Sequence, residues 1–322
     1  MFGRDLRFSL APEPSPLRLM DDSLQYLDPA VLTKISGLDL KARLIVEGFV
    51  SGLHRSPYQG FSVEFAEHRE YVPGDDLRHV DWKVYGKSDR YYLKQFEEET
   101  NFACWLLIDA SESMSYKSDS AAMSKLEYAK HVAAALSWLV IQQQDSAGLV
   151  TFGESVSTFL RPSSQPSHLK QVLHELEQTQ PAGETALGPV LHELAERIRR
   201  RGLVVVFSDL FDDPESMLAG LKHFRHRRHD VTILQVIDPA EQDFAFDEPT
   251  LFKGLELPQE LMTEPRALRR AYRREFEEFL LATKRTARNL NMDYALLRTD
   301  TPLDAALRVF LQSRHRATGS RT

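Results

Sequence analysis

The stretch "LLIDASESM", residues 106–114, decides the fold of the chain. A run of apolar residues reaches Asp109, and Ser111 and Ser113 then follow at every second position. An apolar run without alternation predicts a strand that is buried on both faces, as in parallel sheets covered by helices. The oxygen-bearing side chains at its end could cap a helix, act as a nucleophile, or form half of a metal site.

The pattern around this stretch predicts an α/β domain with a doubly wound, mostly parallel sheet over residues 101–316. Further apolar runs predict strands at 147–152, 156–160, 203–209, 231–238 and 293–298. Helical segments separate most of these runs, and Ser124 with Glu127 has the spacing of a capping box before a long helix. Strands that alternate with helices indicate a parallel sheet covered on both faces. An acidic, Phe-rich insertion at about 239–264 interrupts this scheme.

The chain before residue 101 has a different character. Residues 1–28 are rich in Pro, Ser and charge and predict a poorly ordered leader. Residues 29–100 predict a small α+β module, with helical periodicity to about residue 51 and a break at Gly37. Apolar residues alternate through Phe61, Val63 and Phe65, and "VPGDD" then predicts a turn.

The amino-acid composition limits which kinds of protein and which partners are expected. The 322 residues are 42% hydrophobic and 27% charged, which is typical of a soluble globular protein. A net charge of −7 gives no reason to expect nucleic acid or an anionic membrane as partner. The single cysteine, Cys104, predicts a buried thiol and excludes a Cys-based zinc site. No apolar stretch suits a secretory signal or stable membrane insertion, so we expect a cytoplasmic protein.

Polar side chains at two strand ends predict a common site. Asp109 and Asp209 each end an apolar strand, and Thr185 lies between them in the loop "PAGETALG". Ligands of doubly wound sheets bind beyond the carboxyl ends of the strands. Carboxylate and hydroxyl oxygens suit Mg²⁺, Mn²⁺ or Ca²⁺ and disfavour Zn²⁺ and Cu²⁺. Because few of these ligands carry charge, an acidic residue of a partner could complete the site.

The order Asp109-x-Ser111-x-Ser113, then Thr185, then Asp209 resembles the metal-ion-dependent adhesion site of von Willebrand factor type A domains. That resemblance implies that Ser111, Ser113 and Thr185 touch a Mg²⁺ or Mn²⁺ ion directly. Asp109 and Asp209 would act directly or through bound water.

A second resemblance lies upstream. The block "EFAEHREYVPGDDLRHVDWKVYGKSDRYYLKQFEEE" resembles the bacterial domain of unknown function 58 family, and the likeness runs from about residue 37 to the end. Its motif consists of Arg69, Glu70, Tyr71, Pro73, Gly74, Asp75, Asp76, Arg78, Asp81 and Trp82. The chain departs from relatives at Gly86-Lys87, where they often carry Ala-Arg. The resemblance implies a cytoplasmic interaction module, often linked with MoxR-type AAA+ ATPases, whose metal would bridge to an acidic side chain of the partner.

Three functions remain open from the residues. A nucleophilic-aspartate phosphatase needs a second acid two residues after the first, where this chain has Ser111, and no nucleotide-binding loop is present. We therefore predict a non-enzymatic, metal-dependent interaction module. The alternative is a metal-dependent phosphoester hydrolase that uses the same cluster. The third is a metal-free scaffold that binds through residues 62–96, a block that is either structural or a binding surface.

Overall fold

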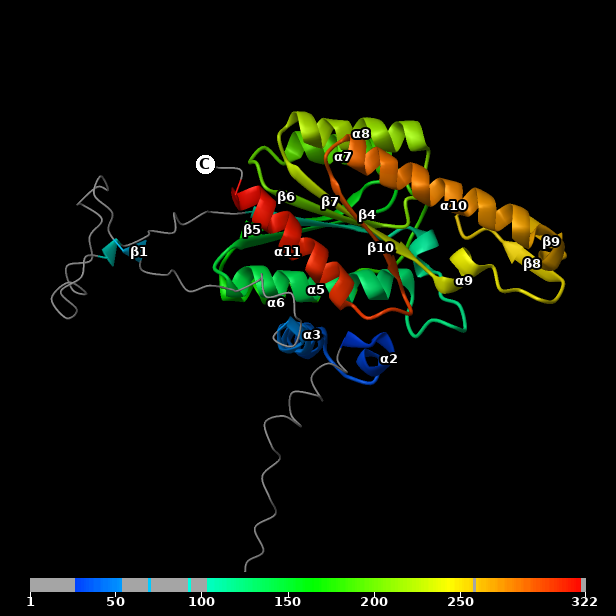
Figure 1. Ribbon diagram of the computed structural model, residues 1–322, viewed down its shortest axis with the longest axis horizontal. Helices are drawn as coiled ribbons and strands as arrows, with labels where there is room; N and C mark the ends of the chain where they lie inside the picture. The colour runs from blue at the N-terminus through cyan, green and yellow to red at the C-terminus, as the bar shows by residue number, and fades with distance from the viewer. Residues whose placement is uncertain (1–26, 54–68, 71–91, 94–102, 257–258, 320–322) are drawn as a thin grey trace, which may run out of the picture.

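A six-stranded sheet forms the centre of the protein (Figure 1). The computed structural model describes residues 27–53, 69–70, 92–93, 103–256 and 259–319. The strands are β3 (Ala103–Asp109), β4 (Ser146–Phe152), β5 (Val156–Ser163), β6 (Leu203–Ser208), β7 (Asp230–Ile237) and β10 (Asp293–Arg298). Their order across the sheet is β10-β7-β6-β3-β4-β5, and only the β4–β5 pair is antiparallel. This confirms the predicted doubly wound, mostly parallel sheet.

Helices cover both faces of the sheet (Figure 1). One layer contains α5 (Lys125–Gln142), α6 (Pro166–Gln178) and α11 (Asp304–Gly319), and the other contains α7 (Leu187–Arg197), α8 (Pro214–His226) and α10 (Pro265–Asn289). Alternate residues of β3 supply the two cores: Leu106 and Ile108 pack on the α5 side, and Trp105 and Leu107 on the α7 side. Burial on both faces explains why the strand is apolar at every position.

The helix α5 begins where the sequence predicts. The Ser124 side chain accepts a hydrogen bond from the backbone N–H of Glu127 at 3.2 Å and caps the first turn. The predicted apolar stripe is buried and includes Leu126, Ala129 and Leu136. Cys104 is fully buried in β3, as its surroundings in the sequence predict.

The described residues before β3 form two helices and a short strand pair. The helices are α2 (Pro29–Leu32) and α3 (Leu38–Leu53), and the break between them contains Gly37 at φ +81°. Ile45 and Phe49 of α3 join the same core cluster as α5. The pair β1 (Arg69–Glu70) and β2 (Tyr92–Leu93) is antiparallel. The other family-motif positions, Tyr71, Pro73, Gly74, Asp75, Asp76, Arg78, Asp81 and Trp82, lie outside the described residues. The strand expected at 61–65 also lies outside the described residues. The domain boundaries stay a prediction.

The acidic insertion forms a helix and a hairpin. The helix α9 (Pro239–Asp243) is followed by β8 (Thr250–Lys253) and β9 (Glu260–Thr263), which pair antiparallel. The base of this insertion packs on α10 through Phe244 and Tyr272, whose rings stack with centroids 4.2 Å apart. Glu256, which follows β8 in the turn of the hairpin, is hydrogen-bonded to Thr185.

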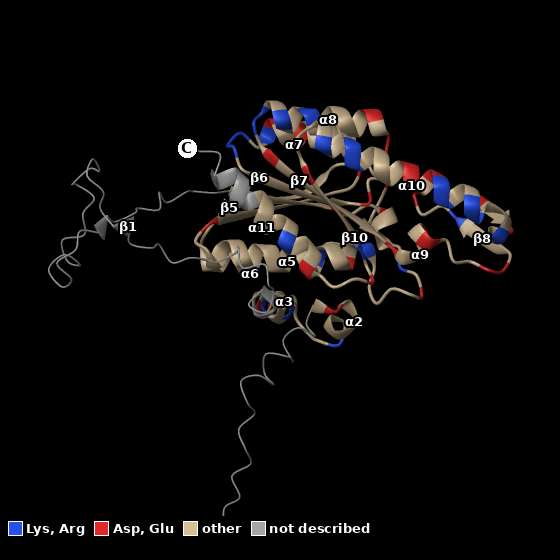
Figure 2. Ribbon diagram, in the orientation of Figure 1, with Lys and Arg blue, Asp and Glu red and all other residues tan. Residues whose placement is uncertain are grey.

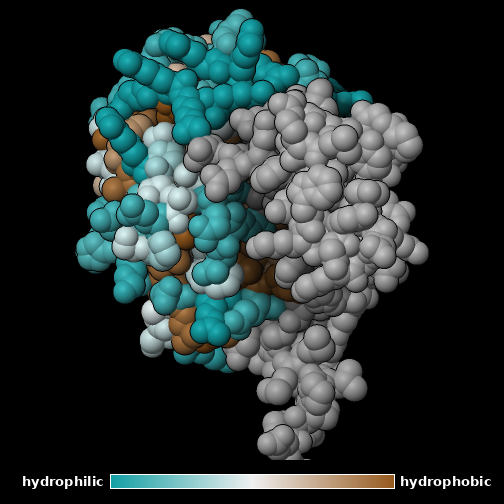
Figure 3. Space-filling view, turned by 90° about the vertical axis from the view of Figure 1, so that its left-hand side faces the viewer, coloured by the Kyte–Doolittle hydropathy of each residue, from teal (hydrophilic) through white to brown (hydrophobic). Residues whose placement is uncertain are grey.

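Charged residues lie on the helices of both layers (Figure 2). Along α10, Lys and Arg lie together with acidic residues. Hydrophilic residues cover the α7–α8 layer at the top of Figure 3. Among the described residues, no helix combines the length and apolarity that crossing a membrane would require. The last helix, α11, continues to Gly319.

Candidate functional site

The strand order places the candidate site at the switch point of the sheet. Counted along the chain, the strands have the order 3-2-1-4-5-6, and β3 and β6 are the central neighbours from which the connections diverge. A crevice forms beyond the carboxyl ends of such a strand pair. Asp109 is the last residue of β3, and Asp209 directly follows β6. The structure therefore brings the two predicted carboxylates to one place.

Asp109 is fully buried and hydrogen-bonded through both oxygens. Oδ1 accepts from the backbone N–H of Ser111 at 3.0 Å, and Oδ2 accepts from Ser208 Oγ at 2.6 Å. Burial, followed by the charge of nearby Asp209, raises the pKa of Asp109 to about 7, although the bonds from Ser208 and Ser111 oppose this shift. Such a crowded pair of buried carboxylates favours the arrival of positive charge.

The loop after β3 presents Ser111 and Ser113 side by side. Their hydroxyl oxygens lie 3.1 Å apart, and Ser111 directly precedes the short 3-10 helix η3 (Glu112–Ser115). The backbone N–H of Glu112 donates to the carbonyl of Gly183 at 2.9 Å. This bond ties the loop to the segment that carries Thr185.

Thr185 meets a residue that the sequence reasoning missed. Its hydroxyl donates to Glu256 Oε1 at 2.9 Å, and its backbone N–H donates to Oε2 at 3.3 Å. The backbone N–H of Ser113 donates to Glu256 Oε1 at 3.4 Å. One carboxylate of the hairpin therefore bridges the loops that carry Ser113 and Thr185. The only sequence signal was the acidic character of the insertion.

Asp209 is fully buried and has a cationic partner. Its Oδ1 accepts from the backbone N–H of Phe211 at 3.1 Å, and its Oδ2 accepts from Lys125 Nζ at 2.7 Å. Lys125 Nζ also donates to Glu241 Oε1 at 2.6 Å. Burial alone would lower the pKa of Lys125, but the charges of Asp209 and Glu241 outweigh burial and raise it. A lysine in the first turn of α5, where the helix dipole disfavours cations, was the unused sequence signal.

The donor set fits a small divalent cation. Neighbouring ligands of an octahedral Mg²⁺ at 2.0–2.1 Å lie about 2.9 Å apart, which is the spacing of hydrogen-bonded oxygens as well. The Ser111–Ser113 and Thr185–Glu256 oxygen pairs have this spacing. Each oxygen of Asp109 and Asp209 accepts one hydrogen bond and keeps a second lone pair, so either carboxylate could contact an ion directly or through bound water. Among the described residues, no group of three or more His, Cys, Asp or Glu side chains is arranged to hold a metal.

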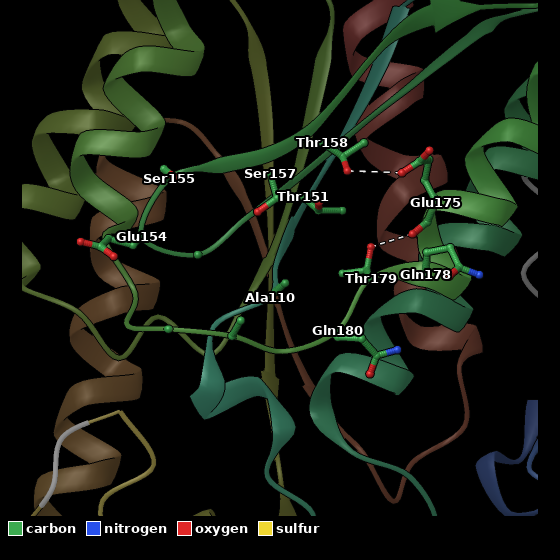
Figure 4. Close-up of a pocket in the computed structure, with 13 residues that line it drawn as sticks. Ala110, Thr151, Glu154, Ser155, Ser157, Thr158, Glu175, Gln178, Thr179 and Gln180 are labelled. Atoms are coloured by element: carbon green, nitrogen blue, oxygen red, sulfur yellow. Dashed lines mark hydrogen bonds between the residues drawn. The ribbon is translucent and has the colours of Figure 1, made fainter.

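A polar cavity of about 440 Å³ lies beside the site (Figure 4). Ala110 and Gly183 form part of its wall and connect it to the loops described above. Glu154 and Ser155 of the β4–β5 turn lie on one side of the cavity and Glu175 of α6 on the other, and the Glu154 carboxylate points away from Glu175 (Figure 4). The Glu175 carboxylate accepts from Thr158 Oγ1 at 3.4 Å. The cavity offers hydroxyl and carboxylate groups to whatever binds next to the site.

Comparison with known families identifies the chain. Residues 67–284 match the family described as "Protein of unknown function DUF58". The chain belongs to this family. The DUF58 protein is 26% identical over 294 residues to "Uncharacterized protein Rv1480" of Mycobacterium tuberculosis (strain ATCC 25618 / H37Rv), covering 90% of this chain and 91% of that relative. The same values hold for "Uncharacterized protein Mb1516" of Mycobacterium bovis.

Solved structures were compared with the DUF58 protein as well. Protein BatB from Bacteroides thetaiotaomicron gives a TM-score of 0.44 at 17% identity, covering 67% of this chain and 98% of that one. An aerotolerance-related membrane protein from Bacteroides fragilis NCTC 9343 gives 0.46 at 19% identity, covering 67% and 99%. The SpRpn10 VWA domain gives 0.31 at 18% identity, covering 42% and 75%.

Proposed function

We propose that this DUF58 protein is a non-enzymatic, metal-dependent interaction module. A divalent cation, Mg²⁺ or Mn²⁺, would be held by Ser111, Ser113 and Thr185, with Asp109 and Asp209 acting directly or through bound water. The bound ion supplies positive charge that attracts an acidic side chain of a protein partner. By its resemblance to the family, that partner is a MoxR-type AAA+ ATPase in a chaperone-like or maturation system.

The contact between Glu256 and Thr185 carries this proposal. A carboxylate rests on the Thr185 hydroxyl, 2.9 Å away, beside the paired hydroxyls of Ser111 and Ser113. The mouth of the site is therefore shaped to receive a carboxylate. An anionic ligand needs a cation beneath it, because buried Asp109 and Asp209 would otherwise repel it.

The balance of charge supports a divalent ion. The carboxyl groups of Asp109, Asp209, Glu241 and Glu256 gather around the site, and Lys125 supplies the opposing charge. With every group ionised, four negative charges against one positive charge leave −3. A divalent cation brings this to −1, which makes the approach of one further carboxylate far less unfavourable.

Thermal unfolding with Mg²⁺ or Mn²⁺ against EDTA tests the metal. A ligand that binds only the native state at 100 times its Kd stabilises by about 2.7 kcal/mol, or about 4 °C for a chain of this size. We expect this rise in the wild type and its loss in Ser113→Ala and Asp109→Asn. Ser137→Ala removes a buried hydroxyl from α5, remote from the site, and should keep the rise. A metal-dependent rise in Tm that is retained in Asp109→Asn would contradict the proposal.

Binding to a purified MoxR-type ATPase tests the partner. The proposal requires binding in Mg²⁺ that is lost in EDTA and in Thr185→Ala. Turnover of p-nitrophenyl phosphate, abolished by Asp109→Asn, would instead favour the phosphoester hydrolase. Binding that persists in EDTA but is lost in Trp82→Ala would favour the scaffold that uses residues 62–96.

A further inference from the structure

Among the described residues, Glu256 joins the β8–β9 hairpin to the candidate site by hydrogen bonds. Glu256 is half-buried, and its carboxylate accepts three hydrogen bonds, from Thr185 Oγ1, Thr185 N and Ser113 N. These bonds span 71 and 143 residues of sequence. These hydrogen bonds from two loops hold the Glu256 carboxylate in a defined position.

In the proposed site, the Glu256 carboxylate occupies the position in which an acidic side chain of a partner would bind. In the proposed site, Thr185 Oγ1 is a metal ligand, and Glu256 Oε1 lies 2.9 Å from it. About 2.9 Å is the spacing of adjacent ligands around Mg²⁺. Glu256 therefore stands where the acidic side chain of a partner would complete the coordination.

The hairpin is attached so that it can move away. Phe252 of β8 stacks on Phe244 with ring centroids 5.5 Å apart, and Phe244 in turn stacks on Tyr272 of α10. Beyond the base, Leu251, Leu261 and Met262 are exposed by 43%, 59% and 69%. Across the described part of the chain, no backbone–backbone hydrogen bond joins the hairpin to the sheet domain. Withdrawal of Glu256 would thus break the carboxylate contacts without opening a core.

We propose that Glu256 is an internal ligand of the site, whose carboxylate occupies the place of the acidic partner side chain until that partner displaces the hairpin. This inference rests on the proposed function. The hairpin then sets a threshold for binding, because the apparent Kd rises by the inverse of the fraction of molecules in the open form. With about one molecule in ten open, removal of Glu256 strengthens carboxylate binding about tenfold.

Water-proton relaxation by bound Mn²⁺ tests the internal ligand, with acetate as a carboxylate probe. Glu256→Gln keeps the shape of the side chain and removes its charge. Glu260→Gln makes the same change in the same hairpin, where Glu260 pairs with Lys253 at 3.0 Å and stays away from the site. At saturating Mn²⁺, we expect higher relaxivity in Glu256→Gln than in the wild type, since water replaces the carboxylate. Acetate should reduce that relaxivity at about tenfold lower concentration, and Glu260→Gln should behave as the wild type.

The outcomes separate this inference from the proposed function. Mn²⁺ bound by all three proteins with equal relaxivity and equal response to acetate would overturn the internal ligand and leave the metal site standing. Mn²⁺ bound by none of them would overturn both. Mn²⁺ binding that is lost only in Glu256→Gln would make Glu256 an obligatory ligand and would overturn its displacement by a partner.

Discussion

Replacement of Lys125 by methionine removes the cation that stabilises the buried acids. The Lys125 side chain has no exposed surface and lies 2.7 Å from Asp209 and 2.6 Å from Glu241. Methionine fills a similar volume and keeps the apolar part of the side chain packed, so the change isolates the charge. The variant leaves Asp209 buried without its partner, with its remaining Oδ1 bond from the backbone of Phe211.

The expected loss of stability follows from the burial of each partner. Removal of one member of a buried ion pair costs about 3–5 kcal/mol, because the other charge stays desolvated. Glu241 keeps 16% of its side chain exposed and recovers some hydration, which favours the lower part of that range. We therefore expect a loss of about 3–4 kcal/mol, or about 4–6 °C in Tm.

Urea unfolding in EDTA measures this loss. The control, Lys170→Met, makes the same chemical change on the exposed face of α6 and should stay within about 0.5 kcal/mol of the wild type. The double variant Lys125→Met/Asp209→Asn should be more stable than Lys125→Met alone, since the unpaired charge is gone. A loss below about 1 kcal/mol in Lys125→Met would refute the reasoning, because it would mean that water reaches the pair.

Three further variants test the packing of the helices. Burial lowers the pKa of His131 to about 4 from its ordinary value of 6.5, so its contribution to stability is full above pH 6.5 and is lost as pH falls toward 4. The wild type should lose about 3 kcal/mol over that window, and His131→Leu should lose correspondingly less when urea midpoints are compared between pH 4 and 7.5. In Gly188→Ala, the new Cβ would clash with Ser216 Oγ and would lie 2.6 Å from the Ser216 carbonyl carbon. We therefore expect a loss of about 1–3 kcal/mol in the free energy of unfolding, measured in urea. An unchanged urea midpoint would contradict the close contact of α7 and α8. Tyr128→Phe removes the hydrogen bond to the Thr301 carbonyl at 3.2 Å and should cost about 0.5–1.5 kcal/mol in thermal melts, whereas a more stable variant would show that this bond contributes nothing.

The site depends on both local and distant contacts, and the sequence predicted the local part. Strand β3 is apolar at every position because helices cover both of its faces, so its place in the centre of the sheet could be read from residues 103–109. Asp109 and Asp209 end two such strands, and the doubly wound topology sends both ends to the switch point. The cap at Ser124 was predictable for the same reason, since its partner, the N–H of Glu127, lies three residues away.

The distant contacts were decided by the tertiary structure. Lys125 is hydrogen-bonded to Asp209, 84 residues away in the sequence, and to Glu241, 116 residues away. Glu256 is hydrogen-bonded to Thr185, 71 residues away. In the sequence, Lys125, Glu241 and Glu256 do not stand out from other charged residues, because the pattern around each reflects local structure and not its distant partner. Only the closure of the sheet and the return of the β8–β9 hairpin bring these charges into a buried space, where low polarity makes each pairing decisive.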